Sequence, residues 1–277
     1  MPSPYLFSLE RAAPKGNAPG RVYRLASGDN FPILSGMSLG TLDLEPAHRY
    51  GPRWNTNAHL IAYCSEGAAA VTIVSPGSLR SHFPVSAGEL FFVERGFLSA
   101  IENDTRRPAR FVVTLSHETP EAFDLSGATG LEGRTQSSRR LTRKARASPH
   151  KLAFGSVEPD VATAGMSVTT IGVQQLTILE RLSARLLRLA PQGGWQPHWH
   201  PNCAELGYVV EGETRVSVMN PAAAVDTFEA RQGDVYFIPL AYPHWLENIG
   251  DREARCIISF GDEDPLDIRL AETLAPV

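Results

Sequence analysis

The sequence is poor in cysteine and contains no long apolar run. Three of its 277 residues are cysteines, Cys64, Cys203 and Cys256, and this small odd number excludes a framework of disulfide bonds. Each lies in an apolar stretch, so we expect packed free thiols in a protein of the reducing cytoplasm. No apolar run approaches the ~20 residues of a membrane-spanning helix. Residues 1–16 also lack the basic and apolar regions of a signal peptide, so no membrane partner is expected.

Charge of either sign is also sparse. Charged residues make up 20% of the chain, and the formal net charge is −4 at pH 7. These values give no reason to expect nucleic acid or an anionic membrane as a partner. The apolar fraction of 43% is that of a globular protein, and the length allows one large domain or two of ordinary size.

Helical patterns are weak, and 23 glycines and 21 prolines are scattered along the chain. Between these turn residues lie short apolar runs, which are typical of strands joined by turns. Residues 205–219 indicate two strands around a turn, and residues 183–191 and 254–261 indicate further strands. Many short strands at regular spacing predict an all-β sandwich or barrel. A short helix is expected only at residues 265–275.

An internal repeat organises the chain. Shifted by 145 residues, the sequence aligns with itself without a gap, so that Trp54 meets Trp199, and the offset holds over residues 4–125. A constant offset over such a length indicates a duplicated unit rather than isolated coincidences. We therefore predict two copies of one domain, at residues 1–130 and 149–277.

A basic segment at residues 131–148 joins the two copies. From residue 133 onward it contains no acidic side chain, and its basic residues are Arg134, Arg139, Arg140, Arg143, Lys144 and Arg146. Such a run can contact an anionic partner, but its composition is more typical of a solvated linker between domains. We interpret it as the linker.

The strongest functional pattern is PHWHPNCAELGYVVEG, at residues 197–212. On a strand, His198 and His200 point to the same face, and Glu205 begins the next strand. His244 lies on a separate strand that can face the same barrel interior. Three imidazoles and a carboxylate suit a divalent transition metal such as Mn, Fe, Co, Ni, Cu or Zn. Four protein ligands on an octahedral ion leave two positions open, which is typical of catalytic sites.

The first copy lacks these ligands. At the offset of 145 residues, the positions of His198, His200, Glu205 and His244 are occupied by Arg53, Asn55, Leu60 and Ser99. An arginine cannot ligate a cation and repels it. We therefore predict one divalent metal per chain, held in the C-terminal domain, and a supporting N-terminal domain without metal ligands. In that domain Arg53 can bind an anion, but we favour a buried structural ion pair or a hydrogen-bonded arginine.

The spacing of these residues resembles the two motifs of the cupin superfamily. In the first, G-x5-H-x-H-x(3,4)-E-x6-G, the match runs from His198 to Gly212 with only the leading glycine displaced. In the second, G-x5-P-x-G-x2-H-x3-N, Ala241 replaces the internal glycine, and the matching residues are Gly233, Pro239, His244 and Asn248. The resemblance covers the chain as a bicupin of the oxalate decarboxylase and germin-like branch. It implies two tandem antiparallel jelly-roll β-barrels with few short helices.

The resemblance also implies a substrate and a metal. Mn is the metal favoured in that branch, although Fe, Zn, Ni or Co suit the ligands too, and the substrate is a small carboxylate such as oxalate. There, an arginine three residues before the first histidine polarises the substrate, but this chain has Trp195. An indole cannot neutralise a carboxylate, but it can pack against an apolar substrate or close the barrel mouth. Trp195 and Tyr208 are the candidate pocket residues. In the decarboxylases of that branch, a glutamate on a lid over the site supplies a proton. This chain has the acids Asp262, Glu263 and Asp264 near its C-terminus, but the sequence does not specify which of them could reach the site.

Three functions are compatible with these observations. The first is an enzyme with oxalate decarboxylase-like or oxidase-like chemistry on a small carboxylate. The second is another cupin reaction, by a dioxygenase or isomerase, on a more apolar substrate beside Trp195. The third is a non-catalytic bicupin that binds a metal or a small molecule. We favour the first, and because bicupins often associate, a homo-oligomer is compatible with it.

Overall fold

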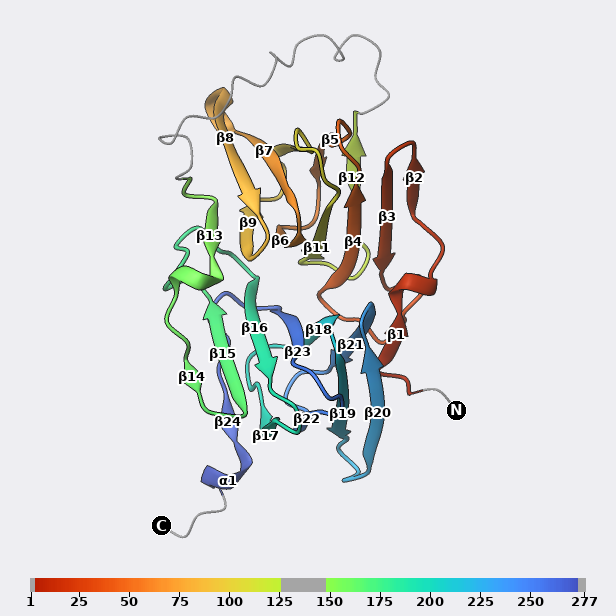
Figure 1. The fold of residues 1–277 in the computed structure, drawn as a ribbon, viewed down its shortest axis with the longest axis vertical. Coiled ribbons are helices and arrows are strands. Elements are labelled where there is room, and N and C mark those ends of the chain that lie inside the picture. The colour runs from red at the N-terminus through yellow and green to blue at the C-terminus, as the bar shows by residue number, and fades with distance from the viewer. Residues whose placement is uncertain (1–2, 126–147, 274–277) are drawn as a thin grey trace.

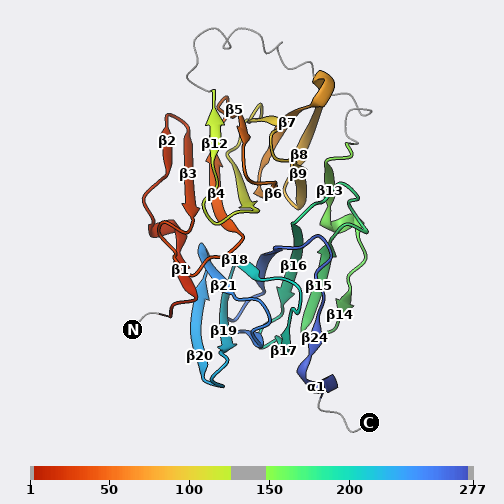
Figure 2. The ribbon, with the colours of Figure 1, turned by 180° about the vertical axis from the view of Figure 1, so that it is seen from behind.

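Two β-barrels are stacked along the long axis of the molecule (Figure 1). The computed structural model describes residues 3–125 and 148–273, so the basic segment predicted at 131–148 lies, apart from Ser148, outside the described residues. Each barrel combines a seven-stranded and a five-stranded sheet of antiparallel strand pairs. Figure 2 shows the two stacked barrels from behind. The predicted all-β class and the pair of barrels are confirmed.

The N-terminal barrel contains twelve strands. They are β2 (Gly16–Ala18), β3 (Arg21–Ala26), β4 (Ser38–Leu44), β5 (Arg49–Asn55), β6 (Leu60–Glu66), β7 (Ala68–Ser75), β8 (Leu79–Ser86), β9 (Glu89–Val93), β10 (Leu98–Glu102), β11 (Ala109–Leu115), β12 (Ala122–Asp124) and β13 (Lys151–Ala153). The larger sheet has the order β13-β9-β6-β11-β4-β3-β2, and the smaller has the order β12-β5-β10-β7-β8.

The C-terminal barrel has the same plan. Its strands are β1 (Leu6–Ser8), β14 (Val161–Ala162), β15 (Met166–Ile171), β16 (Ser183–Leu189), β17 (Gly194–Trp199), β18 (Glu205–Glu211), β19 (Glu213–Met219), β20 (Val225–Arg231), β21 (Asp234–Ile238), β22 (His244–Asn248), β23 (Ala254–Phe260) and β24 (Ile268–Arg269). The larger sheet has the order β1-β21-β18-β23-β16-β15-β14, and the smaller has the order β20-β19-β22-β17-β24.

Helices in the described part of the chain are short. Three are single 3₁₀ turns, and the only α-helix among the described residues is α1; their bounds are Leu9–Arg11, Pro76–Ser78, Phe154–Ser156 and Leu270–Thr273. The helix expected at residues 265–275 begins only at residue 270, because Ile268 and Arg269 pair with β17 as strand β24. None of these helices is long and apolar enough to cross a membrane.

Each copy of the repeat gives its first strand to the other barrel. Strand β1 pairs with β21, with Leu6 opposite Tyr236. Strand β13 occupies the equivalent place in the second copy and pairs with β9, with Lys151 opposite Phe91. Although the repeat runs in two consecutive copies, each barrel is thus completed by residues of both copies.

A shared apolar core joins the two barrels. It is built from residues that are equivalent in the two copies, including Ile61, Tyr63, Phe92 and Val112 from the first and Leu206, Tyr208, Phe237 and Ile257 from the second. At its centre, the equivalent hydroxyls of Thr114 and Ser259 hydrogen bond to each other at 2.7 Å while buried. Removal of this apolar surface from water favours association of the barrels.

Strand alternation separates this shared core from the barrel interior. On β18, Leu206 and Tyr208 belong to the core between the barrels, whereas Val209 belongs to the interior of the C-terminal barrel. Successive side chains on a strand point to opposite faces, so Glu205 and Gly207 share the inward face with Val209. A carboxylate at residue 205 therefore enters an otherwise apolar interior.

We predict that Asn248→Ala and Asn103→Ala destabilise the protein to a similar degree. The Asn248 Nδ2 atom donates to three backbone carbonyls at 2.7–3.0 Å, and Asn103, its equivalent, donates to two at 2.8 and 2.9 Å. Loss of these donors leaves carbonyls unsatisfied and should cost about 2 kcal/mol in each case. Urea denaturation measures the loss, with Gln232→Ala at an exposed position as control. Midpoints equal to that of the unaltered protein would contradict the prediction.

Candidate metal centre

Four side chains meet inside the C-terminal barrel. His198 lies on β17 opposite His244, the first residue of β22, while His200 follows β17 and Glu205 begins β18. Each of the four is at most 2% exposed, and their ligand atoms all lie within 4.8 Å of one another. The structure thus brings together the four residues that the sequence selected as metal ligands.

Backbone carbonyls orient all three imidazoles through Nδ1. The Nδ1–oxygen distances are 2.8 Å from His198 to Gln196, 3.0 Å from His200 to Leu266 and 2.9 Å from His244 to Tyr242. A carbonyl only accepts, so each Nδ1 carries the proton that it donates. The Nε2 atoms are then the nitrogens available to a metal.

Glu205 is the electrostatic centre of the cluster. Its Oε2 atom lies 3.0 Å from Nε2 of His200 and 3.2 Å from Nε2 of His244. Although burial raises it, these two histidines hold the pKa of Glu205 well below its usual range. Burial, followed by the neighbouring imidazoles, lowers the pKa of His198 well below its usual value. The carboxylate is therefore ionised and the His198 ring neutral, which are the forms that bind a metal.

Two buried atoms of the cluster lack a hydrogen-bond partner. They are Nε2 of His198 and Oε1 of Glu205. Polar atoms buried in this way are costly unless a partner satisfies them, and both are metal-binding donor atoms. Three imidazole nitrogens and a carboxylate oxygen in a dry, apolar surround therefore fit a divalent transition metal.

Two further residues of the site were not selected from the sequence. Asp267 Oδ1 lies 2.9 Å from Nδ1 of His200, and the Asp267 carboxylate accepts two hydrogen bonds from the buried guanidinium of Arg185. Although burial raises it, His200 and Arg185 lower the pKa of Asp267. The sequence contained one indication of Arg185. Alternate residues on a strand share a face, so Arg185 points into the barrel with Leu187 and Leu189, where an apolar residue would be expected.

A cavity of about 90 Å³ adjoins the cluster. Its lining residues are Asp160, Val161, Val168, Arg185, Trp195, His198, Asp267 and Arg269. Trp195 thus lies on the wall of this cavity and stacks on His198. Tyr208 lies instead in the core between the barrels, because its even position on β18 faces away from Glu205. None of the acids at 262–264 lines the cavity, and Glu263 accepts a hydrogen bond from the Arg181 amide at 2.8 Å.

A buried phenol near Glu205 has no equivalent at the same position of the first barrel. Tyr236 is fully buried, and its hydroxyl has no hydrogen-bond partner. Burial, followed by the charge of Glu205, raises its pKa well above the ordinary value. The ring fits only because Gly207 lies opposite, since a Cβ there would come within 2.0 Å of the ring. The first copy has Phe91 and Ala62 at these positions.

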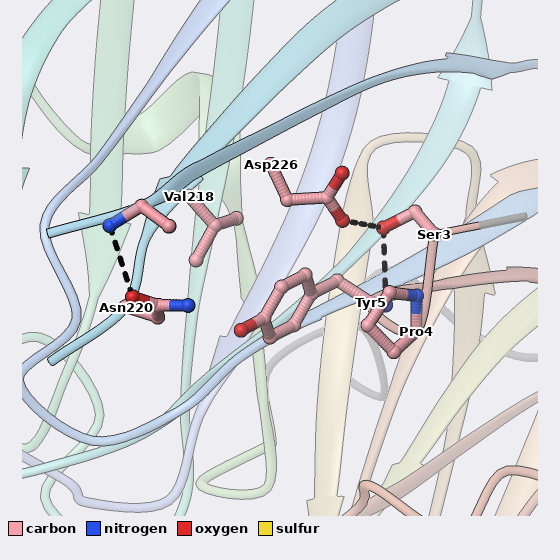
Figure 3. A pocket seen from close by; sticks show the side chains of 7 residues that line it. Ser3, Pro4, Tyr5, Val218, Asn220 and Asp226 are labelled. Carbon is pink, nitrogen blue, oxygen red and sulfur yellow. Dashed lines mark hydrogen bonds between the residues drawn. The ribbon is translucent and has the colours of Figure 1, made fainter. Parts of the chain in front are cut away.

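A larger hollow of about 290 Å³ lies against the N-terminal segment (Figure 3). Ser3 donates a hydrogen bond to Asp226, and the Tyr5 ring lies beside this pair. The hollow is lined by Ser3, Pro4, Tyr5, Val218, Asn220, Ala224 and Asp226. None of the four metal-binding side chains is among these residues, and no basic group is present to hold an anion.

The N-terminal barrel has no comparable cluster among the residues described. Arg53, which replaces the first histidine, places its guanidinium 4.6 Å from the centre of the Tyr50 ring and 6.0 Å from that of Tyr23. Within residues 3–125 and 148–273, one group of side chains is arranged to hold a metal, and it is the cluster around Glu205.

Two antiparallel barrels with one buried cluster of three histidines and a glutamate define a two-domain jelly-roll protein with a single centre suited to a metal. The chain belongs to the cupin family, whose model matches residues 7–144 and 154–276.

Named relatives agree with this assignment. Over 128 residues the chain is 27% identical to oxalate decarboxylase OxdC of Bacillus subtilis (strain 168), covering 46% of this chain and 33% of that protein. Over 115 residues it is 33% identical to germin-like protein subfamily 2 member 2 of Arabidopsis thaliana, covering 41% and 52%. The chain thus spans about a third to a half of the length of these relatives. The structure of oxalate decarboxylase from Bacillus subtilis at pH 4.6 matches with a TM-score of 0.86 at 21% identity, covering 98% of this chain and 80% of that one, and shows the shared fold.

We predict that the protein binds about one equivalent of Mn(II) per chain. His244→Ala should abolish binding without unfolding the protein, because the barrel has an apolar core independent of the ligands. Metal analysis after dialysis, together with circular dichroism, measures both properties. Arg53→Ala is the control in the other barrel and should leave the metal content unchanged. Two equivalents that survive His244→Ala would contradict a single site.

We further predict that metal binding at pH 7 releases about one proton from His200. Burial opposes protonation, but hydrogen bonds to Asp267 and Glu205 raise the pKa of His200 to about 9. The ring is therefore protonated in the metal-free protein at pH 7 and must lose the Nε2 proton to a metal. Affinity should rise with pH up to about 9. Calorimetry in buffers of different ionisation enthalpy counts the protons, and a count of zero would refute the prediction.

Proposed function

We propose that the protein is a metal-dependent enzyme that acts on a small carboxylate, with chemistry of the oxalate decarboxylase or oxidase type, at its single centre in the C-terminal barrel. The observation that carries this proposal is that His198, whose buried Nε2 atom has no hydrogen-bond partner, lines a small cavity together with Arg185 and Arg269. A metal held by four protein ligands keeps positions for substrate, where it can act as a Lewis acid or activate dioxygen.

The size and charge of the cavity favour a small anion. A water molecule occupies about 30 Å³ in the liquid, so a cavity of about 90 Å³ admits a molecule of only a few heavy atoms. Guanidinium groups recognise carboxylates through paired hydrogen bonds. Arg185 is already paired with Asp267, so the metal would supply most of the attraction.

Mn is the metal that we propose for this site. The Bacillus subtilis oxalate decarboxylase has Mn(II) centres, and a carboxylate ligand beside three imidazoles is compatible with that ion. The same donor set accepts Fe, Zn, Ni or Co, so metal availability takes part in the choice.

Two acidic residues, Asp160 and Asp267, line the cavity, and we assign them different roles in the reaction. Decarboxylation of oxalate breaks its C–C bond, releases carbon dioxide and places a proton on the remaining carbon to give formate. Asp267 is held as a carboxylate by Arg185, which makes it a poor proton donor. Asp160 lines the cavity and is exposed to solvent, so we propose it as the group that supplies the proton.

A more apolar substrate is the second candidate. Val161, Val168 and Trp195 line part of the cavity and favour a dioxygenase or isomerase reaction. The Trp195 ring, however, already stacks on His198 with 4.1 Å between the ring centres and contacts Arg185. It is only 8% exposed, which leaves little of its surface for a substrate.

The proposed function predicts turnover of oxalate under air by protein loaded with Mn, compared with Fe and Zn. Formate with carbon dioxide indicates a decarboxylase, and hydrogen peroxide with carbon dioxide indicates an oxidase. Asp160→Asn should lower formate production at least tenfold, the low end of the usual contribution of acid–base catalysis, with the metal content unchanged. Phthalate, which is too large for the cavity, is the control for size. Absence of every product in protein shown to be loaded would refute the oxalate proposal.

A further inference from the structure

We propose that Arg185 is the positioning residue of the metal centre, because its one guanidinium orients two of the three histidines. It acts on His200 through Asp267 and on His198 through Trp195. The inference rests on the proposed metal site, but it does not depend on which substrate is used there.

The first connection consists of hydrogen bonds. Arg185 donates to both oxygens of Asp267, from Nη1 at 3.0 Å and from Nη2 at 2.8 Å, and its Nε atom donates to Thr170 at 2.8 Å. The guanidinium is therefore fixed at three nitrogens. It holds Asp267 in the place where Oδ1 accepts from Nδ1 of His200 at 2.9 Å.

Asp267 needs this support because the carboxylate is at the surface. Its side chain is 34% exposed, whereas that of Arg185 is 4% exposed. A partly exposed carboxylate can turn towards water unless a partner fixes it. A carboxylate behind a ligating histidine sets the ring orientation and raises its basicity, so fixing Asp267 helps to hold His200, whose Nδ1 also lies 3.0 Å from the Leu266 carbonyl.

The second connection consists of ring contacts. The Arg185 guanidinium carbon lies 5.2 Å from the centre of the Trp195 ring, within the range of a cation–π interaction. Trp195 in turn stacks on His198, with an angle of 26° between the ring planes. Phe260 completes the arrangement, since it lies 4.8 Å from the guanidinium carbon and 4.8 Å from the ring centre of His200.

The comparison between the two barrels links Arg185 to the metal ligands. A buried arginine is costly unless its charge and donors are satisfied, so a purely apolar interior would not favour one. The first copy, which lacks the ligands, has Gly40 at the equivalent position. A Cβ at Gly40 would lie 2.1 Å from the Arg24 carbonyl oxygen, so that barrel has no room for a side chain there.

Variants of the two connections test the proposal by affinity for Mn(II). Arg185→Lys keeps the charge but loses the paired hydrogen bonds of the guanidinium to Asp267. Asp267→Asn keeps an acceptor but loses the charge. Each variant should bind Mn(II) roughly 10–100-fold more weakly, as is usual for groups behind metal ligands. Arg185→Met should weaken binding at least as much as Arg185→Lys. Arg188→Lys on the same strand and Asp264→Asn at the exposed surface are matched controls that should bind as the unaltered protein does.

Two spectroscopic readouts separate positioning from loss of fold. In Co(II)-loaded protein, the visible ligand-field bands should shift in Arg185→Lys and Asp267→Asn but not in the controls. In metal-free protein, the ring signals of His200 should shift and broaden in the same variants but not in the controls, because the ring is held less firmly in one orientation. Unchanged affinity and unchanged spectra in folded variants would overturn the proposal. If the unaltered protein binds no metal, the proposed function fails, and the ring signals of the metal-free protein still decide the role of Arg185.

Discussion

A fully buried carboxylate inside an apolar barrel is the constraint on which the rest of the C-terminal domain depends. Glu205 has no exposed surface, and a buried charge is tolerated only where opposite charge and hydrogen bonds offset its desolvation. His200 and His244 reach one of its oxygens, while the other has no partner within the protein. Each of these rings is in turn held at Nδ1 by a carbonyl, so the strands and turns that supply those carbonyls are set by the same requirement.

The two barrels have the same arrangement of strands but enclose different side chains. Where the second encloses polar ligands, the first encloses Arg53 against the rings of Tyr23 and Tyr50. The first barrel nevertheless takes part in building the site. Strand β1 from the first copy extends the sheet in which β21 pairs with β18, the strand that begins with Glu205. The shared core then covers the outward face of β18. Loss of ligands in the first barrel is therefore compatible with its retention, because it supports the strand that carries the carboxylate.

The metal ligands could be predicted because their relation is mostly local. Two histidines two residues apart share a face on any strand, and the repeat showed that a distant His244 belongs to the same unit. Arg185 and Asp267 could not be paired in advance, since 82 residues separate them and their meeting depends on how β24 closes the barrel. Tyr208 was undecided for a related reason, because a shift of one residue in register reverses the face of a side chain. The exchange of β1 and β13 between the barrels could not be predicted either. The hydrophobic pattern of a strand is the same whichever sheet the strand joins.

The replacement of an arginine by Trp195 changes how the site can attract an anion. The resemblance implies a cation three residues before His198, whereas the buried guanidinium on this cavity wall is that of Arg185 on β16, in the other sheet of the barrel. Its pairing with Asp267 makes that part of the wall nearly neutral, since opposite charges in contact cancel much of each other's field. Under the proposed function, attraction of a carboxylate would then depend above all on the metal, whose charge exceeds that of Glu205. In the arrangement that we propose, the buried arginine holds the ligands in place, and the metal itself would be the main anchor for the substrate.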